Sequence, residues 1–172
     1  MHPFFIGHCK IFHLCYNCNI MMNYKVKKVR HPQYGNQHLP ILVDASNSNL
    51  PLPSASLWGW QLWFSHPLNT VSGRLQDLAV FYEYVDQYHP HFFEDSCKLK
   101  TLSTRHINNL TSMLLVNFQY PMNDSVQVKP STFNRRIDSI SLFLEFHYSR
   151  YISRLSDFDQ AEKAEKKSSK VA

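Results

Sequence analysis

The sequence of 172 residues predicts an all-α fold, a core of four to five helices preceded by a short N-terminal extended arm or hairpin. Apolar residues recur at steps of three and four along four segments between Ser54 and Leu155, which is the spacing of amphipathic helices. Pro67, Pro90 and Pro121 separate these segments, and proline disfavours helix at the residue before it. The four glycines lie far apart, so the glycine-rich phosphate turn of a Rossmann or P-loop enzyme is absent.

The first predicted helix covers residues 54–66 and the second 70–89, with Thr70 as its N-cap. The third begins after Thr101 or Ser103 and carries an apolar face as far as Phe118. The fourth is the longest, and Thr132 is its expected N-cap, with Ser131 as the competing candidate. Its apolar stripe consists of Phe133, Ile137, Ile140, Leu144, Tyr148, Tyr151 and Leu155.

The remainder of the chain is divided by composition. Residues 1–22 are interpreted as a non-native extension, because a better-patterned segment follows Met21 and Met22 at once. Residues 23–53 are expected to form a basic extended arm, or a hairpin, and a linker. The helical core-binding domain is expected over 54–157, and 158–172 form a charged tail.

The net charge of +5 is confined to one part of the chain. Residues 31–172 contain equal numbers of basic and acidic side chains, so the excess comes entirely from residues 1–30. This arm contains no acid and five basic residues, namely Lys10, Lys25, Lys27, Lys28 and Arg30. The distribution of charge, rather than its total, is therefore the relevant evidence for a nucleic-acid partner.

Cysteine spacing leaves a metal site open as a minor alternative. Cys15 and Cys18 have the spacing of a zinc knuckle, but the second ligand pair of a structural zinc site is missing. We therefore expect neither a metal nor another cofactor. The N-terminal segment is broken by polar residues and has no uninterrupted apolar stretch long enough for a transmembrane helix, so no membrane partner and a cytoplasmic location are expected.

Three segments of the helical region resemble sequence motifs of the tyrosine recombinase (phage integrase) family. The stretch from Thr70 to Val85 is similar to the family's "T…R…L..F..W" helix, and that from Lys129 to Phe146 is similar to "s..T.N.RL..IR.F..W". Between them, Leu102-Ser-Thr-Arg-His-Ile-Asn-Asn-Leu110 is similar to the linking "LT…I..L" helix. The resemblance covers the N-terminal, core-binding (SAM-like) domain only, over roughly three quarters of the chain.

This resemblance implies a DNA-binding half-clamp of a site-specific recombinase, which acts in DNA integration and recombination on mobile elements. In the family, a following domain carries the nucleophilic tyrosine and its Arg/Lys/His/Arg partners. The one H-x-x-R string here, His147 to Arg150, lies inside the fourth predicted helix. We therefore expect a truncated, non-enzymatic module whose partners are double-stranded DNA and other recombinase protomers.

The candidate DNA contacts gather near two helix starts, where backbone N–H groups and the helix dipole favour phosphate. They are Thr70, Ser72 and Arg74, then Lys129, Thr132, Asn134, Arg135 and Arg136, and on the arm Lys25, Lys27 and Lys28. Each has a structural alternative. The threonines are helix caps first, and the arm lysines could protect an edge strand from aggregation. Arg74 could pair with Asp77, and Arg135 with Asp138, within their own helices.

A second function class is a small helical protein-interaction module. Its partner-binding surface would be aromatic and would consist of Trp58, Trp60, Trp63, Tyr82 and Tyr88.

Overall fold

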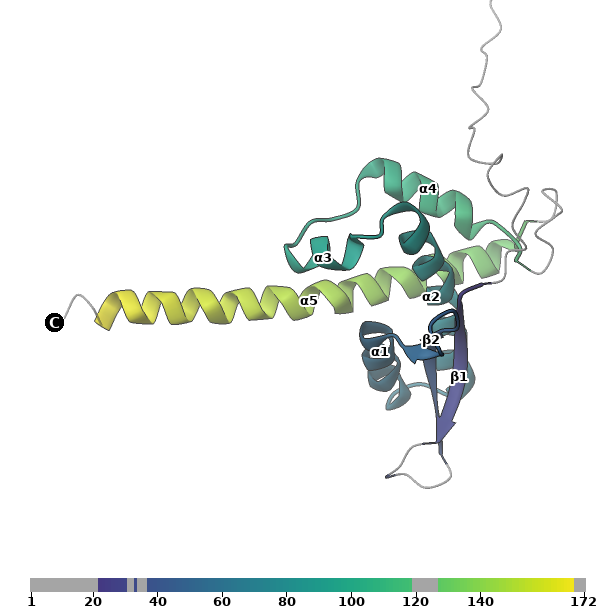
Figure 1. Cartoon of the computed structure of the whole chain (residues 1–172), viewed down its shortest axis with the longest axis horizontal. Coiled ribbons are helices and arrows are strands. Elements are labelled where there is room, and N and C mark those ends of the chain that lie inside the picture. The colour runs from purple at the N-terminus through teal and green to yellow at the C-terminus, as the bar shows by residue number, and fades with distance from the viewer. Residues whose placement is uncertain (1–21, 31–32, 34–36, 119–126, 169–172) are drawn as a thin grey trace, which may run out of the picture.

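The computed structural model describes residues 22–30, 33, 37–118 and 127–168, with side chains as far as Ser153. These residues form a three-stranded antiparallel sheet and five helices (Figure 1). The prediction of an all-α fold is therefore wrong, and the architecture is mixed α and β. The hairpin that the sequence offered as an alternative to an extended arm is present, between the first two strands.

The apolar run near residue 40 is the reason for this difference. The strands are β1 Tyr24–Arg30, β2 His38–Asp44 and β3 Leu50–Pro51, and β2 lies between the other two. Successive side chains of a strand point to opposite faces. Nevertheless, the neighbours Leu42 and Val43 are both buried, at 0% and 1% exposure. β2 is therefore covered on both faces and is the central strand of a packed layer.

β1 is only half covered. Tyr24 and Val26 pack against the core, and the Tyr24 ring lies 5.5 Å from the ring of Tyr82. Lys25 and Lys27, on the opposite face of the strand, are exposed. This alternation is that of an edge strand with one face on the core and one in solvent.

Five helices follow the sheet, and four of them correspond to predicted segments. They are α1 Pro53–Trp63, α2 Leu68–Tyr88, α3 Phe92–Cys97, α4 Thr104–Leu114 and α5 Pro130–Ser168. The short α3 was not expected as a separate helix. α2 is central, because it contacts β1, β2, α1, α4 and α5. Its fully buried side chains, Val71, Leu75, Leu78, Phe81 and Tyr84, supply much of the core.

Thr70 and Thr132 are not the N-caps that the sequence analysis expected. α2 begins directly after Pro67 and α5 begins at Pro130, so Thr70 and Thr132 lie within the first turns instead of ahead of them. Proline is favoured there because its fixed φ suits a helix start and its missing N–H would be unpaired anyway. The start of α4 was placed correctly, since Ser103 accepts a hydrogen bond from the backbone of the third residue on, at 3.4 Å.

α5 is 39 residues long, or about 58 Å at the usual rise of an α-helix. Its N-terminal half packs on the body, and its C-terminal half extends away from it (Figure 1). Near the point of departure, the Tyr148 hydroxyl donates a hydrogen bond to the Lys100 carbonyl at 2.8 Å. Neither α5 nor any other helix in the described part of the chain is long and apolar enough to cross a membrane.

His147, the histidine of the H-x-x-R string, is a core residue. It is 1% exposed, and its Nε2 lies 2.8 Å from the Ser96 hydroxyl, which in turn donates to the Phe93 carbonyl at 2.8 Å. The serine proton is thus used, so Nε2 is the protonated nitrogen and Nδ1 is a buried acceptor with no partner among the described residues. Burial, assisted by the nearby Arg150, lowers the pKa of His147.

Candidate nucleic-acid interface

The basic arm and the start of α5 meet at one hollow on the surface. The hollow measures about 840 Å³ and lies between β1, α2 and the N-terminal end of α5. Its charged lining residues and its threonine are Lys25, Asp77, Lys129, Thr132, Arg135 and Arg136. Five of these six were predicted as DNA contacts from the sequence. Their convergence was not predicted, because Lys25 was assigned to a separate arm.

The start of α5 has the electrostatic character that binds anions. The helix begins at Pro130, and the backbone N–H groups of Thr132 and Phe133 both donate to the Lys129 carbonyl, at 2.9 and 3.1 Å. Its first turn contains no acidic side chain, so the partial positive charge of the helix end is not offset within it. Lys129 and Asn134 are exposed here, and Lys129 adds a full positive charge at the rim.

Arg135 is held by a buried carboxylate of α2. Its Nε and Nη2 donate to Oδ2 and Oδ1 of Asp77 at 3.1 and 2.9 Å, and the Ser139 hydroxyl donates to the same Oδ2 at 2.9 Å. The Asp77 side chain is 2% exposed, whereas that of Arg135 is 53% exposed. Nη1 of Arg135 has no partner among the described residues, so a guanidinium oriented by Asp77 presents one free edge to solvent.

Arg74 forms the reciprocal pair. Its Nη1 lies 2.9 Å from Oδ2 of Asp138 on α5. The expected partners within each helix, Arg74 with Asp77 and Arg135 with Asp138, are thus exchanged crosswise between α2 and α5. The exchange joins the two helices at two points, and it leaves the Arg74 side chain only 19% exposed.

Arg136 is directed into the protein. Its Nη1 donates to the carbonyls of Leu114 and Val116, at 2.6 and 2.9 Å, and its guanidinium lies 5.5 Å from the centre of the Phe118 ring. Burial lowers the pKa of Arg136. Its charge therefore serves chiefly to satisfy the carbonyl end of α4, which carries partial negative charge.

The other predicted contacts lie outside the hollow. Thr70 is exposed, whereas the hydroxyl oxygen of Ser72 is buried without a partner among the described residues. Lys27 and Lys28 are exposed on β1 but do not line the hollow. The sequence analysis did not find the role of Asp77 as the partner of Arg135, because nothing in its position showed that it would be buried between two helices.

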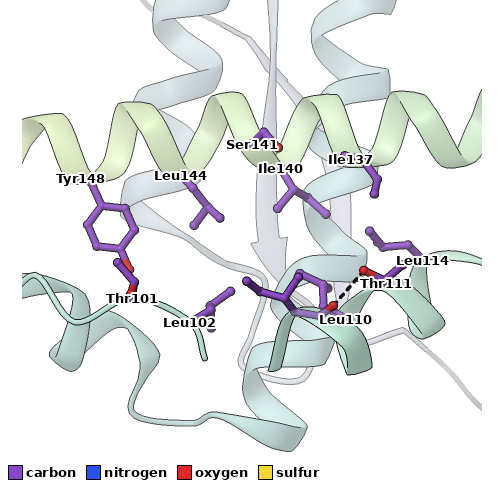
Figure 2. A pocket seen from close by; sticks show the side chains of 11 residues that line it. Thr101, Leu102, Leu110, Thr111, Leu114, Ile137, Ile140, Ser141, Leu144 and Tyr148 are labelled. Atoms are coloured by element: carbon purple, nitrogen blue, oxygen red, sulfur yellow. Dashed lines mark hydrogen bonds between the residues drawn. The ribbon is translucent and has the colours of Figure 1, made fainter. Parts of the chain in front are cut away.

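A second concave surface is apolar. A groove with a volume of about 340 Å³ lies between α4 and α5, and Figure 2 shows the side chains that line it. Its apolar lining residues include Leu102, Ile107, Leu110, Ile137, Ile140 and Leu144. Ile107 and Ile137 remain 49% and 38% exposed. This groove does not contain the aromatic residues that the sequence suggested as an interaction surface, and two of those, Trp58 and Tyr82, are buried in the core.

No cluster of three or more metal-ligating side chains occurs among the residues that the structure describes. The candidate zinc cysteines, Cys15 and Cys18, lie outside those residues. No protein-family model matches the chain, and neither a curated protein nor a solved structure matches it.

Proposed function

We propose that the protein binds double-stranded DNA, with phosphates of the backbone held at the hollow between β1 and the start of α5. The observation that carries the proposal is the convergence of Lys25, Lys129 and the acid-free start of a long helix on one concavity. Lysine side chains and helix N-termini are among the groups that contact DNA phosphates. The single acid among the described lining residues, Asp77, is already neutralised by Arg135.

Arg135 has a defined part in this proposal. Because Asp77 holds its Nε and Nη2, the side chain loses little further conformational freedom when Nη1 donates to a phosphate. Arg74 and Arg136 support the interface indirectly, by fixing α5 against α2 and α4. The proposed module therefore binds DNA mainly through lysines and one preoriented arginine.

The wider role we propose is that of the core-binding half-clamp of a site-specific tyrosine recombinase, in line with the three sequence segments that resemble motifs of this family. The proposed activity is binding without strand cleavage. The buried position of His147 supports this, because a core imidazole bonded to Ser96 cannot reach a phosphodiester.

Fluorescence anisotropy with a labelled DNA duplex tests the proposal over a salt series. The logarithm of the binding constant should fall linearly with the logarithm of salt concentration, by about 0.9 for each phosphate neutralised. The Lys25→Gln/Lys129→Gln double variant should bind more weakly and reduce this slope by roughly two. The matched control is Lys98→Gln/Arg105→Gln, which removes two exposed cations away from the hollow. Salt-insensitive binding, or an equal loss in the control, contradicts the proposal.

A second candidate function is a protein-interaction module that uses the apolar groove of Figure 2 in place of the aromatic surface expected from the sequence. It predicts no duplex binding at all in the same titration, so the two functions are separated by one measurement.

A further inference from the structure

One edge of the sheet has backbone groups with no partner in the described part of the chain. The Ala45 N–H donates to the Asn23 carbonyl at 2.6 Å, and these two residues oppose each other in the register of β1 and β2. Hydrogen-bonded and non-bonded pairs alternate along an antiparallel ladder. Lys25 and Lys27 therefore bond to β2, whereas the N–H and C=O groups of Val26 and Lys28 point away from it.

The structure limits where this edge is open. At its beginning, the Tyr24 N–H is already used, because it donates to Oε1 of Glu83 at 3.0 Å. After Tyr24 the outer edge of β1 has no neighbouring strand among the described ones, because their order is β1–β2–β3. The open positions are thus Val26, Lys28 and, at the end of the strand, Arg30.

There is room beside this edge. Tyr24, Lys25 and Val26 are consecutive, and their side chains alternate between the two faces of the sheet, yet all three line the same hollow. The hollow therefore reaches the edge of the strand beside Tyr24, Lys25 and Val26, whereas Lys28 lies outside it. Lys129 and Arg135 line the same hollow, so a segment placed there would lie within reach of further positive charge.

The charge on β1 selects the occupant. The strand carries four cations, Lys25, Lys27, Lys28 and Arg30, and no acid. Pairing with β1 of a second copy would place cations opposite cations, which is destabilising. The chain's own residues 1–22 have no acid either. Cross-strand neighbours of opposite charge are favourable, so an acidic strand is the complementary one.

We propose that an acidic, extended peptide segment of a partner protein adds to the sheet as a strand, pairing with Val26 and Lys28 at the open edge of β1. Main-chain hydrogen bonds would provide affinity, and the lysines on both faces would select acidic side chains. The added strand would lie beside the same hollow as the proposed DNA contact, but its mechanism differs, because it uses backbone groups that a phosphate interface does not need.

Proline substitution separates the two mechanisms. Lys28→Pro removes an outward-pointing N–H and a charge, and the ladder with β2 does not use that N–H, so the edge strand tolerates the change. Lys28→Gln removes the charge alone and is the matched control. Retained far-UV circular dichroism and an unchanged unfolding midpoint show that both variants fold.

The probe is a fluorescein-labelled peptide of about eight alternating glutamates and valines, and the same peptide with lysine in place of glutamate is its control. The wild-type chain should bind the acidic peptide and not the basic one. Lys28→Gln should weaken binding only slightly, and Lys28→Pro should weaken it by about tenfold more, because a peptide carbonyl loses its donor. Equal affinities of the two variants overturn the proposal.

Amide hydrogen exchange provides a second readout. Peptide binding should slow exchange at Val26 and Lys28, whose N–H groups are open, and leave Lys25 and Lys27 unchanged, since the ladder already protects them. Duplex DNA should bind Lys28→Pro and Lys28→Gln equally. An extra loss of duplex binding in Lys28→Pro would assign the edge to DNA instead and overturn the strand-addition proposal, whereas failure of duplex binding in the wild type leaves it standing.

Discussion

The crosswise ion pairs between α2 and α5 should differ widely in their contribution to stability, although each is closed at 2.9 Å. Arg135→Met leaves the buried Asp77 carboxylate with the Ser139 hydroxyl as its remaining hydrogen-bond partner among the described residues. Removing one partner of a buried pair costs about 3–5 kcal/mol. We expect the lower end, about 3 kcal/mol, because position 135 is half-exposed and water can reach Asp77 from there.

The control uses the other pair. Asp138 is 58% exposed, so Asp138→Asn leaves the Arg74 guanidinium free to turn towards water. An exposed pair of this kind contributes at most about 1 kcal/mol. The two substitutions therefore compare a buried and an exposed ion pair across the same two helices.

Urea unfolding, followed by far-UV circular dichroism, measures both free energies, and an unchanged m-value shows that only stability has altered. The double variant Asp77→Leu/Arg135→Met should recover most of the loss, because a buried ion pair is often replaceable by apolar side chains. If Arg135→Met costs no more than Asp138→Asn, burial of Asp77 does not govern this contact and the reasoning is refuted.

Three further substitutions test other parts of the fold. Burial lowers the pKa of His147, so this side chain takes up a proton more readily in the unfolded chain than in the folded one. The contribution of neutral His147 to stability should therefore be complete above pH 6.5, the ordinary pKa of histidine, and should decline as the pH falls below it. His147→Phe should flatten this acid limb in urea titrations at several pH values, and an unchanged limb would exclude His147 as its source. A methyl group at Gly59 would lie 3.2 Å from buried Leu75, so Gly59→Ala should lower the thermal midpoint despite alanine's better helix propensity. At Gly73 the nearest atom would be Nη1 of Arg135 at 3.8 Å, so Gly73→Ala should stabilise by about 1 kcal/mol; a loss there would mean that the helix packs more tightly than these distances indicate.

Local signals in the sequence were sufficient to locate the four longer helices. The three-and-four spacing of apolar residues and the prolines between them located α1, α2, α4 and α5, because both act within a few residues. The exact starts were missed at Thr70 and Thr132, since α2 begins directly after Pro67 and α5 begins at Pro130. Caps and prolines compete for the same positions, and their order in the sequence does not settle which is used.

The class of fold required information that no local window contains. Residues 39–43 read equally well as an apolar arm segment or as a strand, and only packing on both faces made them the centre of a sheet. The function of the arm lysines depends on the same packing, because it turned the basic segment into an edge strand and placed Lys25 at the hollow.

The sequence by itself determined where the four longer helices lie, where the positive charge resides and which side chains are candidates for binding phosphate. The tertiary structure decided which of those charges are available. Sequence spacing suggested pairs within each helix, but packing of α2 on α5 exchanged the partners, so that Arg74 is bound to Asp138 and Arg135 to Asp77. The physical reason is that an ion pair depends on distance and burial, and both are set by contacts between segments far apart in the chain.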